Sequence, residues 1–141
     1  MDGYRFTMEK RVRYSETDAV GIANNLSFFR YFEIGRTEYW RSMDAILPEI
    51  ERKTLGIVMV HQECDYRLPA YPDELLEVGV RTASVGETSI VTEYRLHRKE
   101  TNEVIAEGNT VHVTMDAQTR KPVPVPDPIR EKLSRFENKS F

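Results

Sequence analysis

The sequence predicts an α+β fold in which a five-stranded antiparallel sheet curves around one long helix. The first observation is a single helical run at residues 26–43, which contains no proline and one glycine. The second is a set of five segments in which apolar and polar residues alternate with the period of a β-strand. The third is that the last three segments are joined by tight turns, as in an antiparallel meander.

Five strands are expected, at residues 4–13, 57–68, 75–85, 88–98 and 104–115. Tyr14 is expected to continue the first strand. In the second strand the alternation predicts that five residues share one face: Val58, Val60, Cys64, Tyr66 and Leu68. Residues 44–53 are expected to form a loop or a short extra helix broken at Pro48, and residues 129–136 a short closing helix.

The helical run carries a broad aromatic stripe, which indicates a helix that is mostly buried. Gly35 lowers helix propensity by about 1 kcal/mol relative to alanine, so we expect another backbone to pack close to it. Glu33 and Arg36 are three residues apart and are expected to pair along the helix, as are Glu38 and Arg41.

The chain is expected to form one domain, residues 1–141, with residues 136–141 frayed at its end. No apolar run approaches the roughly 20 residues of a membrane span, and residues 1–14 lack the apolar centre of a signal peptide. The single cysteine, Cys64, excludes an internal disulfide and a cysteine-based zinc site. We therefore expect a cytoplasmic protein. The formal charge of −3 argues against a general nucleic-acid binder, which would need a basic face.

Asp18 lies in a polar loop directly before the helix, and Asn24 or Asn25 is expected to cap the first helical turn. A helix start presents free N–H groups and the positive pole of the helix dipole. Amides can polarise a carbonyl, and a carboxylate can attack it or activate a water. Asp18 therefore indicates a hydrolase, although the same pattern also fits an aspartate that only caps a turn or the helix.

Several stretches resemble the hotdog-fold acyl-CoA thioesterases of the 4-hydroxybenzoyl-CoA thioesterase family. The matching residues are VRY at 12–14, TDAVGI at 17–22, Asn24, FFRYFEIGRTE at 28–38, ECDYRLPA at 63–70, DEL at 73–75 and VGETS at 85–89. The resemblance covers nearly the whole chain. It implies the hotdog fold, hydrolysis of an acyl-CoA thioester to a free acid and coenzyme A, and no metal or organic cofactor.

The family's catalytic aspartate falls on Asp18, as nucleophile or as general base. Its carbonyl-polarising amides fall near Asn24 and Asn25, and the acyl group is expected near Tyr14 and the helix start. Many relatives have a histidine where Asn25 stands, and asparagine carries no proton at neutral pH. Seven basic residues are candidates for the coenzyme A phosphates: Arg67, Arg81, Arg95, Arg98, Lys99, Arg120 and Lys121.

The resemblance also implies a homodimer or homotetramer with the active site between subunits. A second function remains open, namely a hotdog protein that binds acyl-CoA or an acyl carrier without turnover, and Asn25 is the feature that favours it. A dehydratase or hydratase would need a histidine base beside the acid. His61, His97 and His112 are expected on three strands, away from Asp18. Cys64 is expected among core residues, where a nucleophilic role is disfavoured.

Overall fold

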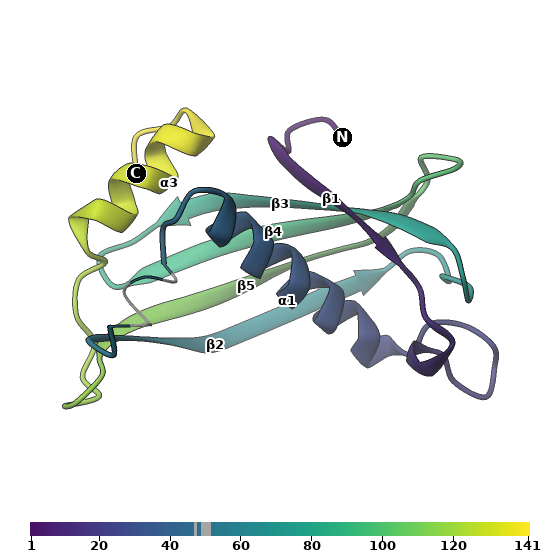
Figure 1. Ribbon diagram of the computed structural model, residues 1–141, viewed down its shortest axis with the longest axis horizontal. Helices are drawn as coiled ribbons and strands as arrows, with labels where there is room; N and C mark the ends of the chain where they lie inside the picture. Colours follow the sequence, from purple (N-terminus) through teal and green to yellow (C-terminus); the bar gives the residue numbers. More distant parts are fainter. Residues whose placement is uncertain (47, 49–51) are drawn as a thin grey trace.

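The computed structural model of the protein describes residues 1–46, 48 and 52–141. One helix crosses a face of a five-stranded sheet, and a second helix lies at one end of it (Figure 1). The elements in chain order are β1 (Phe6–Arg11), the short 3₁₀ turn η1 (Tyr14–Glu16), α1 (Asn25–Ser42), β2 (Leu55–Tyr66), β3 (Leu75–Val85), β4 (Ser89–Arg98), β5 (Val104–Asp116) and α3 (Asp127–Glu137).

The sheet order is β1-β3-β4-β5-β2, and every neighbouring pair is antiparallel. The predicted meander of three consecutive strands is confirmed as β3-β4-β5. β1 and β2 are the two edges of the sheet, and α1 lies between them in sequence. Along the chain, α1 and β2 separate the loop between β1 and α1 from the end of β2.

α1 has 18 residues and packs its aromatic stripe on the sheet, with Tyr31, Phe32 and Tyr39 fully buried. The Phe32 ring stacks on that of Tyr94 in β4, with centroids 4.5 Å apart. Gly35 meets side chains and not another backbone, since a Cβ there would lie 2.7 Å from Val78 Cγ1 and 2.9 Å from Val80 Cγ2. The prediction of a close backbone was therefore wrong, although the close approach itself is present.

Two expectations about charged and polar residues are also corrected. Arg36 does not pair with Glu33 but is buried, and its Nη1 donates to Tyr94 Oη at 3.1 Å. Tyr14 does not continue the first strand. The chain leaves β1 after Arg11, because the backbone N–H of Arg13 donates to the Glu16 carboxylate at 2.7 Å and turns the chain into η1. The predicted Glu38–Arg41 pair is present.

The alternation predicted for the second strand is interrupted by a β-bulge. Met59 pairs with His112 and His61 with Val111, so Val60 is an extra residue on β2. An extra residue reverses which side chains face the helix. Val58 and Val60 are therefore exposed on the opposite face from Cys64 and Tyr66, which the uninterrupted alternation placed with them.

α3 begins two residues before the predicted closing helix and ends one residue after it. Its buried Glu137 accepts hydrogen bonds from Tyr39 Oη at 2.5 Å and from the Thr82 backbone N–H at 3.0 Å. The expected loop or short helix at residues 44–53 lies partly outside the described residues. Among the residues described, no helix is long and apolar enough to cross a membrane. The single domain and the fraying of residues 136–141 stay predictions.

Candidate active site

A pocket of about 490 Å³ lies where the Asp18 loop, the start of α1 and the end of β2 meet. Nine residues line it: Asp18, Ile22, Ala23, Asn25, Phe28, Tyr66, Arg67, Leu68 and Pro69. Its walls are mostly apolar, and its polar groups are few. This combination is typical of a site that orients a small molecule by a few hydrogen bonds.

The Asp18 loop is a tight loop closed by an isolated antiparallel β-bridge between Thr17 and Ala23. The Asp18 N–H donates to the Ile22 carbonyl and the Gly21 N–H to the Asp18 carbonyl, both at 3.0 Å. Gly21 adopts a φ of +85°, which a side chain would disfavour. Asp18 Oδ1 accepts from the Val20 N–H at 2.8 Å, so the carboxylate is oriented while remaining exposed to solvent.

The start of α1 borders the same pocket through Asn25. Asn24 is the N-cap, and its side-chain oxygen accepts from the Leu26 N–H at 2.8 Å, while its carbonyl accepts from the Ser27 N–H at 2.9 Å. Asn25 is the first helical residue, and no acceptor for its N–H is found in the part of the chain that the structure describes. This amide at the positive end of the helix is therefore available to a carbonyl oxygen.

Aromatic side chains form the apolar wall. The Phe28 and Tyr66 rings meet edge to face with centroids 5.1 Å apart, and Tyr66 Oη donates to the Asn25 carbonyl at 2.9 Å. The turn after β2 is tied to the Asp18 loop, since the Ala23 N–H donates to the Ala70 carbonyl at 2.7 Å. The wall and the carboxylate loop are thus held to one another by backbone and side-chain bonds.

The structure brings together Asp18, Asn25 and Arg67 of the predicted site residues. It does not bring in Tyr14, whose side chain is 75 % exposed and outside the pocket lining, or Asn24, which is engaged in capping. For Tyr66 the sequence predicted only that it shares a face of the second strand with Val58, Val60, Cys64 and Leu68. Its place in the wall follows from the β2 bulge, which the alternation of apolar and polar residues does not indicate.

Arg67 is paired less closely than four of the other predicted phosphate ligands, namely Arg81, Arg95, Arg98 and Lys99. Its guanidinium lies 3.5 Å from the Glu107 carboxylate and is 55 % exposed. Arg81 and Arg95 are held at 2.6 and 2.8 Å from carboxylates on neighbouring strands. A cation that is exposed and loosely paired loses less when it turns to a new anion.

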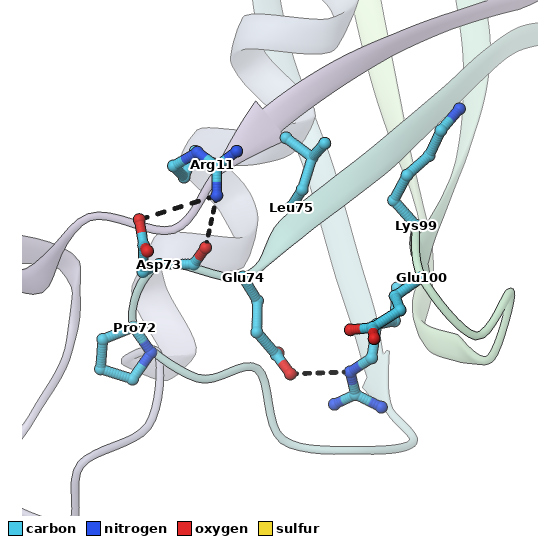
Figure 2. A pocket seen from close by; sticks show the side chains of 8 residues that line it. Arg11, Pro72, Asp73, Glu74, Leu75, Lys99 and Glu100 are labelled. Atoms are coloured by element: carbon cyan, nitrogen blue, oxygen red, sulfur yellow. Dashed lines mark hydrogen bonds and ion pairs between the residues drawn. The ribbon is translucent and has the colours of Figure 1, made fainter.

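A second pocket, of about 390 Å³, lies between β1, the start of β3 and the end of β4 (Figure 2). Its three cations are all paired with carboxylates: Arg11 with Asp73 at 3.6 Å, Arg98 with Glu74 at 2.9 Å, and Lys99 with Glu77 at 3.0 Å. Figure 2 shows the contacts between Arg11 and Asp73 as dashed lines. Glu100 adds a further carboxylate to the lining. Three cations and three carboxylates thus line this pocket, and because each cation is already paired, the pocket offers little net attraction to phosphate groups.

The remaining nucleophiles and histidines lie outside the Asp18 pocket. Burial raises the pKa of the Cys64 thiol to about 11, which disfavours its thiolate. Burial, with a smaller contribution from Arg36, lowers the pKa of His112 to about 4. His97 is buried and its Nδ1 lies 2.9 Å from Asn102 Oδ1. Within residues 1–46, 48 and 52–141, no three His, Cys, Asp or Glu side chains are grouped to hold a metal ion.

The chain is similar to known proteins over most of its length. The model of the thioesterase-like superfamily matches residues 12–133. The acyl-CoA thioesterase YbgC of Haemophilus influenzae is 32% identical over 127 residues, which cover 89% of this chain and 91% of that protein. The 1,4-dihydroxy-2-naphthoyl-CoA hydrolase of Synechococcus elongatus is 26% identical over 138 residues, covering 94% and 96%.

Among solved structures, a thioesterase from Thermus thermophilus, complexed with coenzyme A and zinc, has a TM-score of 0.86 to this chain. The two are 28% identical, and the match covers 100% of both chains. The five-stranded antiparallel sheet with α1 and α3 thus matches the hotdog thioesterase structures, as the sequence resemblance implied.

Proposed function

Because the chain belongs to the thioesterase-like superfamily, we propose that it is an acyl-CoA thioesterase, which hydrolyses an acyl-CoA thioester to a free acid and coenzyme A. The observation that carries the proposal is that one pocket joins the Asp18 carboxylate, the first amide of α1 and an aromatic wall. The names of relatives that align over most of the chain support it, since they include an acyl-CoA thioesterase and an acyl-CoA hydrolase.

In this proposal the thioester carbonyl oxygen accepts a hydrogen bond from the Asn25 N–H, which stabilises the negative charge that develops on that oxygen. The Asp18 carboxylate then acts in one of two ways. As a nucleophile it attacks the carbonyl carbon, the C–S bond breaks, coenzyme A leaves as a thiolate, and water hydrolyses the resulting anhydride. As a general base it removes a proton from the attacking water. Neither route calls for a resident metal or organic cofactor.

A single turnover in ¹⁸O-labelled water separates the two routes. With excess enzyme, the nucleophilic route places the label in the Asp18 carboxylate whenever water attacks the Asp18 carbonyl carbon of the anhydride, and mass spectrometry of the Asp18 peptide detects it after that one turnover. The general-base route places the label only in the released acid. Label in the Asp18 peptide therefore excludes a purely general-base role.

The rest of the pocket would hold the two ends of the substrate. The acyl group lies against Phe28 and Tyr66, and Arg67 turns to a phosphate of coenzyme A, since it is the loosely paired cation at this pocket. Asn24 contributes by capping α1, which keeps the neighbouring Asn25 amide in place. Tyr14 stays a predicted substrate contact outside the pocket lining.

The first test of the proposal replaces Asp18 by asparagine. We expect Asp18→Asn to lower thiol release from a panel of short, long and aromatic acyl-CoAs by about 10³-fold or more. The amide of the variant lacks the charged oxygen that would attack the carbonyl carbon or accept a proton from water. Asp44→Asn is the matched control, since Asp44 is exposed and lies just past the opposite end of α1. Retained turnover in Asp18→Asn would exclude the mechanism.

One observation favours a second function, which is binding of an acyl-CoA or an acyl carrier without turnover. Asn25 places an amide side chain at the pocket, and an amide cannot donate a proton as an acid at neutral pH. In the same panel, an absence of thiol release from wild-type protein that still binds an acyl-CoA in calorimetry would establish this second function instead.

We propose that the protein acts in the cytoplasm as a homodimer or homotetramer, with residues 1–141 as one domain. The oligomer is supported by β2, a 12-residue edge strand whose Val58 and Val60 are 42 % and 60 % exposed. An exposed apolar edge strand offers unpaired backbone groups to another copy. The cytoplasm is supported by the sequence, which has one cysteine and hence no internal disulfide.

A further inference from the structure

The side chain of Glu16 is enclosed between three segments of the chain. Its Oε1 accepts hydrogen bonds from the Arg13 backbone N–H at 2.7 Å, from Lys10 Nζ at 3.0 Å and from Tyr31 Oη at 3.3 Å. Lys10 belongs to β1 and Tyr31 to α1. The Glu16 and Lys10 side chains are 14% and 12% exposed, so this ion pair is mostly shielded from water. The carboxylate therefore joins the edge strand to the helix.

The backbone carbonyl of the same residue holds the start of α1. It accepts from the Asn24 N–H and from Ser27 Oγ, each at 2.8 Å. Residues 17–23 leave from Glu16 and return to Asn24, and the bond between Glu16 and Asn24 closes the base of this loop. Asp18 lies near the beginning of this loop, and Asn25 comes directly after Asn24 at its end.

We propose that Glu16 is a positioning residue, whose carboxylate and carbonyl together fix the Asp18 loop relative to the first amide of α1. The inference rests on the proposed function, because it concerns the separation of the two groups that would act on the thioester. A displacement of about 1 Å in such a pair lowers turnover by about 100-fold, so a residue that fixes their separation acts on kcat. Glu16 does not line the Asp18 pocket, so it acts through the loop and not on the substrate.

The charge of Glu16 is part of its role. Burial on its own would raise the pKa of Glu16, but the hydrogen bonds from Arg13 and Lys10 outweigh it and hold the pKa below its ordinary value. The group is therefore a carboxylate at neutral pH, and hydrogen bonds to a charged acceptor are stronger than those to a neutral amide. Glutamine at this position has the same shape but a weaker acceptor and no charge for Lys10.

The kinetic test compares Glu16→Gln with Glu33→Gln, which removes an exposed carboxylate from α1 outside this network. We expect Glu16→Gln to lower kcat for thiol release by about tenfold or more while KM stays within about twofold, since substrate contacts are retained. Tyr31→Phe removes one of the three bonds and serves if the glutamine variant folds poorly; its kcat should fall less. Unchanged kcat in both, or a rise in KM alone, would overturn the proposal.

Hydrogen exchange provides a second measurement that does not depend on turnover. The amides of Asp18 and Gly21 donate hydrogen bonds within the loop, and those of Ala23 and Asn24 donate to Ala70 and Glu16. Glu16→Gln should therefore speed the exchange of these four amides relative to Glu33→Gln. Unchanged exchange would overturn the positioning role. If wild-type protein releases no thiol from any acyl-CoA, the proposed function fails and with it the catalytic consequence. The exchange rates still decide whether Glu16 organises the loop.

Discussion

At the scale of single residues, the chain keeps a small set of polar groups inside its core. Arg36 is 7% exposed, and the Tyr94 hydroxyl that accepts from it lies 2.7 Å from Thr110 Oγ1. The guanidinium also lies over the Trp40 ring, 5.5 Å from its centroid. The His112 ring meets Trp40 edge to face at 5.6 Å. A buried cation beside a histidine disfavours protonation of that histidine.

The pH dependence of stability should report on His112. Its pKa is lowered from 6.5 to about 4, by burial first and by Arg36 second. Between these values the unfolded chain binds a proton that the folded chain does not, so stability falls as pH decreases through this range. From pH 7.5 to 5.0, we expect the wild type to lose about 1–2 kcal/mol more free energy of unfolding than His112→Gln.

Urea unfolding of both proteins at the two pH values measures this difference. The comparison with a variant is needed because carboxylates that are ion-paired in the fold also lose stabilisation in acid. Arg36 on α1 is the charged group that acts on His112. Parallel losses of stability in the two proteins would show that His112 is protonated in the folded state.

At the scale of elements, the contact between α1 and β3 depends on Gly35. A Cβ at this position would lie under 3.0 Å from methyl groups of Val78 and Val80, both of which are fully buried. Overpacking of this kind costs about 1–3 kcal/mol, whereas alanine gains about 1 kcal/mol of helix propensity over glycine. The overpacking is the larger effect, because β-branched valines in a buried strand have little freedom to move.

We therefore expect Gly35→Ala to lower the free energy of unfolding by about 1–2 kcal/mol, measured by urea denaturation. Val78→Ala removes the closest methyl group and leaves space for the new one. The double variant Gly35→Ala/Val78→Ala should be more stable than the sum of the two single effects predicts. Additive effects would show that the helix shifts away from the strand instead.

At the scale of the whole molecule, the two edges of the sheet differ. β1 is six residues long, whereas β2 has 12 residues and ends at the wall of the Asp18 pocket. An oligomer formed along β2 would place a second copy beside the pocket. It would also cover the exposed side chains of Val58 and Val60. A lysine on an edge strand opposes pairing of that strand with another copy.

We expect Val60→Lys to dissociate the oligomer into single chains of 16.5 kDa, while the wild type has two or four times that mass. Sedimentation equilibrium measures the mass directly. Thr7→Lys is the matched control, because it places the same charge at an exposed position of the other edge strand. An oligomer that survives Val60→Lys but not Thr7→Lys would assign the interface to β1.

The sequence by itself determined the elements and the position of the carboxylate loop. Period-two alternation in residues 75–85 and the proline-free run before Met43 are local properties, and the observed strands and helix follow them closely. Asp18 before a capped helix start is likewise a local feature, since Asp18 lies seven positions before Asn25.

Only the tertiary structure decided which residues join Asp18 and which do not. The β2 bulge turns Tyr66 toward Phe28, and the Glu16 carboxylate bends the chain so that Tyr14 leaves the strand. Arg67 reaches the pocket because the end of β2 lies beside the start of α1. The bulge and the place of Arg67 depend on contacts between residues far apart in the chain, and local periodicity carries no information about such contacts. The Arg13–Glu16 turn is local, but it is a single side-chain contact and not a periodic feature.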